Sequence, residues 1–136
     1  MAILRAATLY WAAIFGLGFL LGTVRVLWGA AAIGETAFVL VEVPAMLAAS
    51  FVAARLLLRR YALDSLRETG LMGGLAFTLL IIAELALAML VGDLRPYEWF
   101  ASLWTVPFFY GTLGQIAFGL MPTAICHFLP HRQRSD

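Results

Sequence analysis

The chain has 136 residues, of which 63% are hydrophobic and only 12% are charged, and its formal net charge is +1. Soluble domains are about half apolar and about a quarter charged, so this composition indicates a single integral membrane domain over residues 1–136. The basic residues form no stripe that would bind nucleic acid, and the single cysteine, Cys126, excludes an intramolecular disulfide or a thiolate cluster.

Four segments are long and apolar enough to cross a bilayer, for which a helix needs roughly 20 residues. They cover residues 8–28, 36–58, 70–91 and 103–128. The first is too long for the apolar region of a secretory signal peptide, about 7 to 15 residues, so we expect it to remain in the protein. The sequence therefore predicts an all-α fold, a transmembrane bundle of four helices.

The segment "RPYEWFASLW" separates the third and fourth spans. Pro96 suits the first turn of a helix, and Tyr97, Phe100 and Trp104 fall on one apolar side. We expect a short helix that lies along the outer membrane surface. Aromatic residues near the ends of the spans predict two interfacial belts: an outer one with Trp28, Tyr97, Trp99 and Trp104, and an inner one with Tyr10, Trp11 and Tyr61.

Arginines are distributed unequally between the two sides of the predicted bundle. One side has Arg5, Arg59, Arg60, Arg67, Arg132 and Arg134, whereas the other has Arg25 and Arg95 together with Glu35, Asp93 and Glu98. The positive-inside rule therefore places both termini in the cytoplasm. Arg95 and Glu98 are expected to be solvated at the outer surface.

Small residues mark the expected packing faces, because helices in lipid associate where their backbones approach closely. They recur at about helical spacing in the first, second and last spans, as Gly18, Gly22, Ala45, Ala49, Ala53, Gly111 and Gly119. The third span, which contains Gly73, has a weaker stripe of small residues. We expect these faces to point into the bundle.

Each span has one strongly polar side chain on the same face as its small residues. These are Arg25, Glu42, Glu84 and Gln115, and Tyr110 lies at a similar depth. Ionisable groups inside a membrane are costly and are functional candidates for that reason. Arg25, Glu42, Glu84, Tyr110 and Gln115 are therefore the predicted binding site, in the outer half of the bundle. An ion pair of Arg25 with Glu42 that only fixes helix register is the alternative.

Two prolines interrupt the spans. Pro44 leaves the carbonyl of Leu40 without its helical N–H, and Pro122 does the same to the carbonyl of Phe118. A free carbonyl at this depth is tolerated inside protein or against a wet cavity. We therefore expect both kinks to face the interior, with the turn of Pro44 next to Glu42.

Catalytic and metal-binding patterns are absent from the sequence. Cys126, His127 and His131 lie near one another, but Pro130 interrupts the helix between the histidines. No phosphate-binding loop, zinc-protease motif or nucleophile elbow occurs. We expect no metal, no cofactor and no enzymatic activity.

The chain shows two resemblances to known families, one in its architecture and one in the sequence of a single stretch. Four spans with intramembrane glutamates resemble the small multidrug-resistance transporters, but here the carboxylates lie in the second and third spans, whereas that family uses one in the first. The stretch "LGTVRVLWGAAAIGETAFVLVEVPAMLAASFVAAR", residues 21–55, is similar to uncharacterised four-helix inner-membrane proteins of proteobacteria. That likeness implies a bacterial inner membrane and no particular activity.

The leading hypothesis is a small transporter-like or channel-like protein, homo-oligomeric or part of a larger membrane complex, with an unknown small ligand or ion. Full ionisation of Arg25, Glu42 and Glu84 leaves a net charge of −1, and Glu84 is the carboxyl expected to hold a proton near neutral pH. The competing hypothesis is an accessory or assembly subunit, whose polar and small residues grip a partner.

Overall fold

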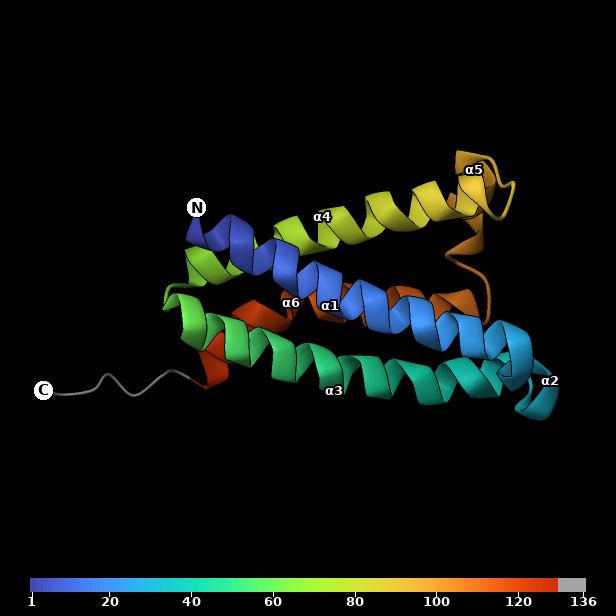
Figure 1. The fold of residues 1–136 in the computed structure, drawn as a ribbon, viewed down its shortest axis with the longest axis horizontal. Helices are drawn as coiled ribbons and strands as arrows, with labels where there is room; N and C mark the ends of the chain where they lie inside the picture. Colours follow the sequence, from blue (N-terminus) through green and yellow to red (C-terminus); the bar gives the residue numbers. More distant parts are fainter. Residues whose placement is uncertain (130–136) are drawn as a thin grey trace, which may run out of the picture.

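A computed structural model describes residues 1–129, and every regular element in that part of the chain is a helix (Figure 1). The all-α prediction is therefore confirmed for the described residues. His131, Arg132 and Arg134 lie outside them. The elements in chain order are α1 Ala2–Val24, the π-helix η1 Arg25–Gly29, α2 Ala30–Ile33, α3 Glu35–Tyr61, α4 Leu66–Leu90, α5 Pro96–Ser102 and α6 Phe108–Phe128.

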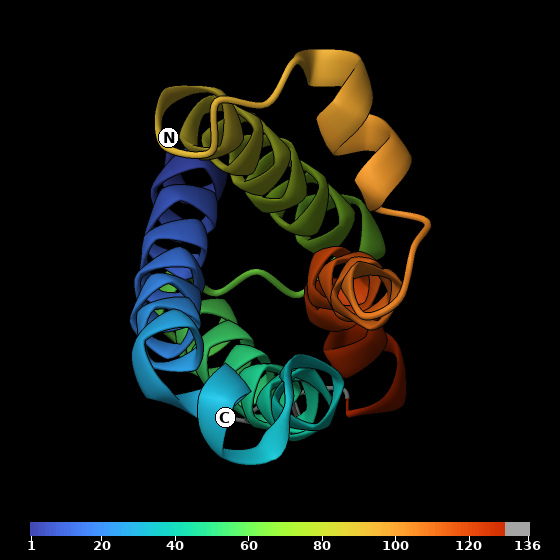
Figure 2. The same cartoon turned by 90° about the vertical axis from the view of Figure 1, so that its right-hand side faces the viewer.

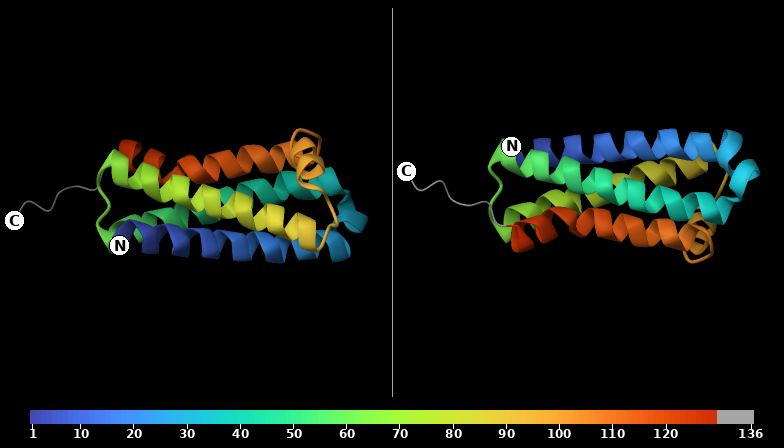
Figure 3. Two further views of the ribbon diagram at one scale, coloured as in Figure 1. Left: turned by 90° about the horizontal axis from the view of Figure 1, so that it is seen from above. Right: turned by 90° about the horizontal axis from the view of Figure 1, so that it is seen from below.

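The four long helices lie side by side in a square. Seen end-on, α1 contacts α3 and α4, and α6 contacts the same two helices from the opposite corner (Figure 2). The N-terminus, the α3–α4 loop and the end of α6 lie at one end, which we call the N-terminal end (Figures 1 and 3). The other, called the α5 end, has α2 and α5. The chain therefore forms two helical hairpins, α1–α3 and α4–α6.

Three helical stretches are long and apolar enough to cross a membrane: residues 2–33, 35–61 and 66–90. They include the first three expected spans almost completely. The fourth expected span begins later than residue 103, because residues 103–107 form turns and α6 starts at Phe108. α6 is not among these three stretches, because Gln115, Pro122 and His127 lower its hydropathy.

Local sequence signals set the ends of the helices. Gly34 separates α2 from α3 with a φ of 87°, which a side chain would disfavour. Ser65 begins α4 with a capping box, in which Glu68 N donates to Ser65 Oγ (3.2 Å) and Ser65 N donates to Glu68 Oε2 (3.3 Å). Pro96 is the first residue of α5, which confirms the helix expected there.

Buried apolar side chains gather toward the N-terminal end. The core consists of Ala6, Ala7, Tyr10, Ile14, Ala54, Leu58, Leu63, Met72, Ala76, Leu80, Phe118 and Ile125. Beyond Ile14 on α1 and beyond Leu80 on α4, no residue of these two helices is buried. Figure 1 shows α1 and α4 diverging over the same stretch. The packing of α1 and α4 is thus tight near the N-terminal end and loose near the α5 end, where α3 and α6 still bury Val39 and Thr112.

Large apolar side chains cover the outside of the helices along their length. Phe19 is 53% exposed, Ile82 59% and Leu120 61%. In water such a surface would aggregate, whereas in a bilayer it contacts lipid tails at no cost. Together with the length and composition of the helices, it indicates a membrane protein.

Tyr10 corrects the expected inner aromatic belt. Its side chain is 0% exposed, so it belongs to the core and not to an interface. Trp28 (66% exposed), Tyr97 (65%) and Trp104 (60%) are exposed at the α5 end, where the outer belt is expected.

The small residues divide into those that pack closely and those that do not. A Cβ on Gly18 would lie 3.1 Å from Met46 Cε, and one on Gly119 would lie 3.1 Å from Phe77 Cβ. The closest approach of two helices joins Gly73 and Gly119, because a Cβ on Gly73 would overlap the Gly119 carbonyl oxygen.

The structure differs from the sequence-based assignment at three small residues. Nothing lies within 4 Å of the Cβ position of Gly111, and only the side chain of Arg25 lies that near Gly22. Ala45 is exposed, while Ala49 and Ala53 pack at the margin of the core. The inward face of α3 consists instead of Ser50, Ala54 and Leu58, about one residue round the helix from the expected stripe.

Candidate functional site

Arg25 and Glu42 form an ion pair within the first hairpin. Arg25 is the first residue of η1 and Glu42 lies in the second turn of α3. The guanidinium Nη1 lies 2.8 Å from Glu42 Oε2, and the side chains are 23% and 12% exposed. The π-helical turn begins at Arg25, directly where α1 ends. The structure thus brings together the two charges that the sequence paired.

Glu84 and Gln115 form a second polar pair, within the other hairpin. Gln115 Nε2 on α6 donates to Glu84 Oε2 on α4 at 2.6 Å. Glu84 has no cationic group in hydrogen-bond contact among residues 1–129, although Arg25 acts on it electrostatically. The carboxyl of Glu84 therefore accepts one hydrogen bond, from the Gln115 amide, and its charge is only partly balanced by the more distant Arg25.

The four side chains, which we call the polar quartet (Arg25, Glu42, Glu84 and Gln115), continue the inward faces of their helices. Glu84 follows Leu80 by one turn, and Gln115 precedes Phe118 by one turn. The quartet therefore occupies the positions where apolar core residues would come next, in the loosely packed half near the α5 end.

Tyr110 is not part of these contacts. It is half-buried, its ring lies 6.3 Å from that of Phe109 between centroids, and its hydroxyl has no hydrogen bond to any residue in the range 1–129. Its expected place in the site is thus not matched by a contact.

The two prolines lie in different surroundings. Leu40 and Pro44 are both exposed, on the opposite side of α3 from Glu42, so the kink of α3 does not face the interior as expected. Pro122, by contrast, is fully buried. The Phe118 carbonyl that it leaves free accepts a hydrogen bond from the Tyr10 hydroxyl at 3.0 Å.

Tyr10 is the interior residue that sequence reasoning missed. Its ring stacks on Phe118, with centroids 4.4 Å apart and planes 15° apart, and the buried Ser50 is another neighbour. A usable signal existed, because the free carbonyl opposite Pro122 needs a donor and Tyr10 lies at the matching depth on α1.

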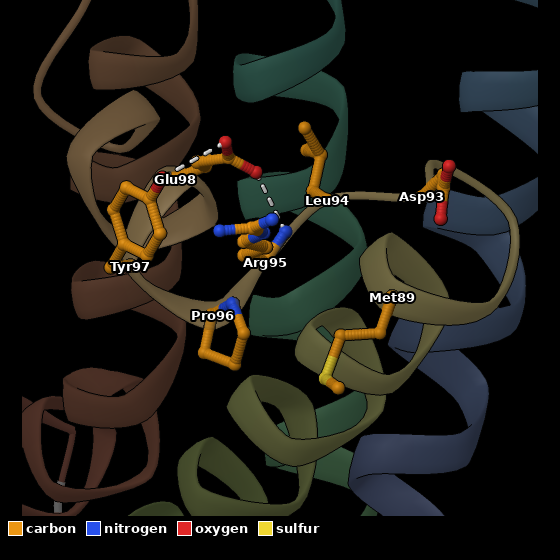
Figure 4. A pocket seen from close by; sticks show the side chains of 7 residues that line it. All are labelled: Met89, Asp93, Leu94, Arg95, Pro96, Tyr97 and Glu98. Carbon is orange, nitrogen blue, oxygen red and sulfur yellow. Dashed lines mark hydrogen bonds between the residues drawn. The ribbon is translucent and has the colours of Figure 1, made fainter.

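A shallow hollow at the α5 end lies apart from the quartet. Its volume is about 680 Å³, and its lining consists of Met89, Asp93, Leu94, Arg95, Pro96, Tyr97 and Glu98 (Figure 4). Glu98 accepts from the Arg95 backbone N–H at 2.8 Å and from the Tyr97 hydroxyl at 3.2 Å, both exposed. These residues bond mainly to their own turn, and their exposure fits the solvated surface expected for Arg95 and Glu98.

The side chains of Cys126 and His127, at the end of α6, are not part of a cluster of metal ligands within the described residues. Cys126 Sγ donates to the Asp64 carbonyl at 3.2 Å, and His127 packs against Phe128. No cluster of three or more potential ligands occurs in residues 1–129.

Comparison with models of known protein families, with curated proteins and with solved structures gives no match to this chain. The similarity of residues 21–55 to proteobacterial inner-membrane proteins therefore stays a prediction, and function has to be argued from the site.

Proposed function

We propose that this protein is a small transporter-like protein of a bacterial inner membrane, which takes up a proton or a small cation at the polar quartet. The four long helices cross the bilayer as a bundle, and α5 lies along the outer surface. Both termini are cytoplasmic. The arginine distribution supports this orientation, since Arg5, Arg59, Arg60 and Arg67 belong to the N-terminal end.

The observation that carries the proposal is the arrangement of the quartet. Each long helical segment contributes one charged or amide side chain to this group, all four on inward faces, in the half where α1 and α4 have no buried apolar residue. Packing alone does not call for this, since apolar side chains would fill the same positions at no desolvation cost.

Charge balance suggests where uptake occurs. Glu42 has a full cationic partner at 2.8 Å, whereas Glu84 has only the amide of Gln115. A carboxylate without a partner at membrane depth gains most from a proton or a cation. Gln115 also keeps its amide oxygen available as a second acceptor, so Glu84 and Gln115 together offer two oxygens to one bound cation.

Proton flux into vesicles tests the proposal. The purified chain is reconstituted into liposomes that contain a pH-sensitive dye, and a potential is applied across the membrane. We expect Glu84→Gln to abolish the protein-dependent flux and Glu98→Gln, an exposed acid at the α5 end, to leave it unchanged. Equal flux in the two variants would refute uptake at the quartet. A wild-type flux no greater than that of protein-free liposomes, measured with protons and separately with sodium and potassium, would also refute it.

A second candidate function is supported by the unfilled packing of the α5 end. The halves of α1 and α4 that lack buried residues expose Phe19, Leu20 and Ile82, and a helix of another protein could cover them as it would in a membrane complex. Cross-linking from a photoreactive residue at Leu20 in native membranes distinguishes the two. A single protein partner of different mass supports an accessory subunit, and lipid adducts alone oppose it.

A further inference from the structure

The two hairpins are each held by their own polar pair. Arg25–Glu42 joins η1, which continues α1, to α3, and Glu84–Gln115 joins α4 to α6. Only one hydrogen bond in residues 1–129 connects a long helix of one hairpin to a long helix of the other, and it is the bond from the Tyr10 hydroxyl to the Phe118 carbonyl. That bond crosses the square from α1 to α6, which lie at opposite corners (Figure 2).

The acceptor of this bond depends on Pro122. Proline has no N–H, so the Phe118 carbonyl has no helical partner and relies on Tyr10 while the interior is dry. The missing backbone bond also makes α6 easier to bend at this level than a continuous helix. One residue thus creates both the need for Tyr10 and a place where α6 can move.

The bond between Tyr10 and Phe118 is buried among packed side chains. Tyr10 is 0% and Phe118 3% exposed, and their rings are stacked. On the other side of α6, Gly73 and Gly119 bring the backbones of α4 and α6 into contact, with Pro122 Cδ 3.4 Å from the Cβ position of Gly73. The contact of α4 with α6 is therefore tight at this level, and opening is left to the contact of α6 with α1.

We infer that Tyr10 and Phe118 form a gate between the polar quartet and the N-terminal end. In the structure the gate is closed, while the half of the bundle around the quartet is loosely packed. Opening separates α1 from α6, and water replaces the Tyr10 hydroxyl at the Phe118 carbonyl. Replacing one neutral hydrogen bond by another changes the free energy little. If the closed contact were purely apolar, water could form no hydrogen bond to replace it. The gate rests on the proposed function, because it controls access to the same quartet.

A double-mutant cycle tests the coupling of Tyr10 to Pro122. Tyr10→Phe keeps the ring stack but removes the donor, and Pro122→Ala returns a backbone N–H to the Phe118 carbonyl. In reversible unfolding of the whole chain in detergent micelles, we expect Tyr10→Phe to lower the ratio of folded to unfolded protein roughly fivefold in the wild type and less than about twofold beside Pro122→Ala. Equal losses in both backgrounds would overturn the inferred role of Pro122.

Thiol accessibility tests the gate itself and needs no ligand. Cys126→Ser removes the native thiol, and Ser50→Cys places a probe beside Tyr10. Two vesicle preparations of opposite orientation are used, so that the reagent reaches the protein from one side at a time. A small membrane-impermeant reagent should label Ser50→Cys slowly in both. Adding Tyr10→Phe should speed labelling about tenfold, only from the side on which Ser65→Cys reacts.

The outcomes separate the two proposals. Labelling that is unchanged by Tyr10→Phe, or faster from the α5 side, would overturn the gate whatever the flux assay shows. Faster labelling from the N-terminal side would support the gate even if the liposomes show no proton flux, in which case the quartet has another ligand.

Discussion

Glu42→Gln tests the strength and purpose of the Arg25–Glu42 pair. The variant keeps the size of the side chain and an acceptor oxygen but removes the negative charge opposite the guanidinium. Exposed ion pairs contribute about 0.2–1 kcal/mol, and removal of one partner of a buried pair costs about 3–5 kcal/mol. Side-chain exposures of 23% and 12% place this pair between those limits.

We therefore expect Glu42→Gln to lower the free energy of unfolding by about 2 kcal/mol, the range of a hydrogen bond to a charged group. Reversible unfolding of the chain in micelles measures this, with Glu98→Gln as a control that changes an exposed carboxyl. Arg25→Gln in the Glu42→Gln background should recover part of the loss, because it removes the unpaired charge. A loss below about 0.5 kcal/mol, or simple addition of the two single effects, would refute the reasoning that the pair is desolvated.

Three further expectations follow from the packing, the charges and the orientation. Gly73→Leu should prevent folding, because the leucine side chain would overlap the α6 backbone, whereas Gly22→Leu should change stability little. Unfolding midpoints in detergent that fall equally in the two variants would contradict this account of the packing. Infrared difference spectra in lipid near neutral pH should show a protonated carboxyl band that Glu84→Gln removes, and its absence would leave Glu84 ionised. In a Cys126→Ser background in intact cells, Ser65→Cys should resist an impermeant thiol reagent and Ser102→Cys should react, and the reverse pattern would invert the topology.

The helices and their order could be predicted from the sequence, because they depend on the apolar composition of many consecutive residues. The helices, their order and the short helix at Pro96 follow from apolar length, turn signals and a proline in a first turn. The pairing of Arg25 with Glu42 was also predictable, since two opposite charges in neighbouring spans at similar depth have few other partners in lipid.

The faces of individual helices were harder to predict. In lipid an alanine or glycine is equally acceptable inside or outside the bundle, so Gly22, Ala45 and Gly111 looked like packing residues although none contacts another helix closely. The partner of Glu84 was not determined by charge either. It is the amide of Gln115, which becomes evident only when the angle between α4 and α6 is known.

Tyr10 illustrates the same difficulty for aromatic residues. Near the end of a span, a tyrosine usually marks the interface, where its hydroxyl meets water. Here the hydroxyl finds a carbonyl inside the protein instead, and the residue that makes this possible, Pro122, is on another helix far along the chain.

The division into two hairpins has a consequence for biosynthesis. Arg25 and Glu42 belong to the half of the chain that leaves the ribosome first, so their charges can neutralise each other before the second half has been made. A carboxylate and a guanidinium that partition into the bilayer as a pair cost far less than either alone. Glu84 has to wait for Gln115, on a helix synthesised later. We therefore expect the first hairpin to integrate into the membrane on its own, and the second one to complete its integration only when its last helix has been made.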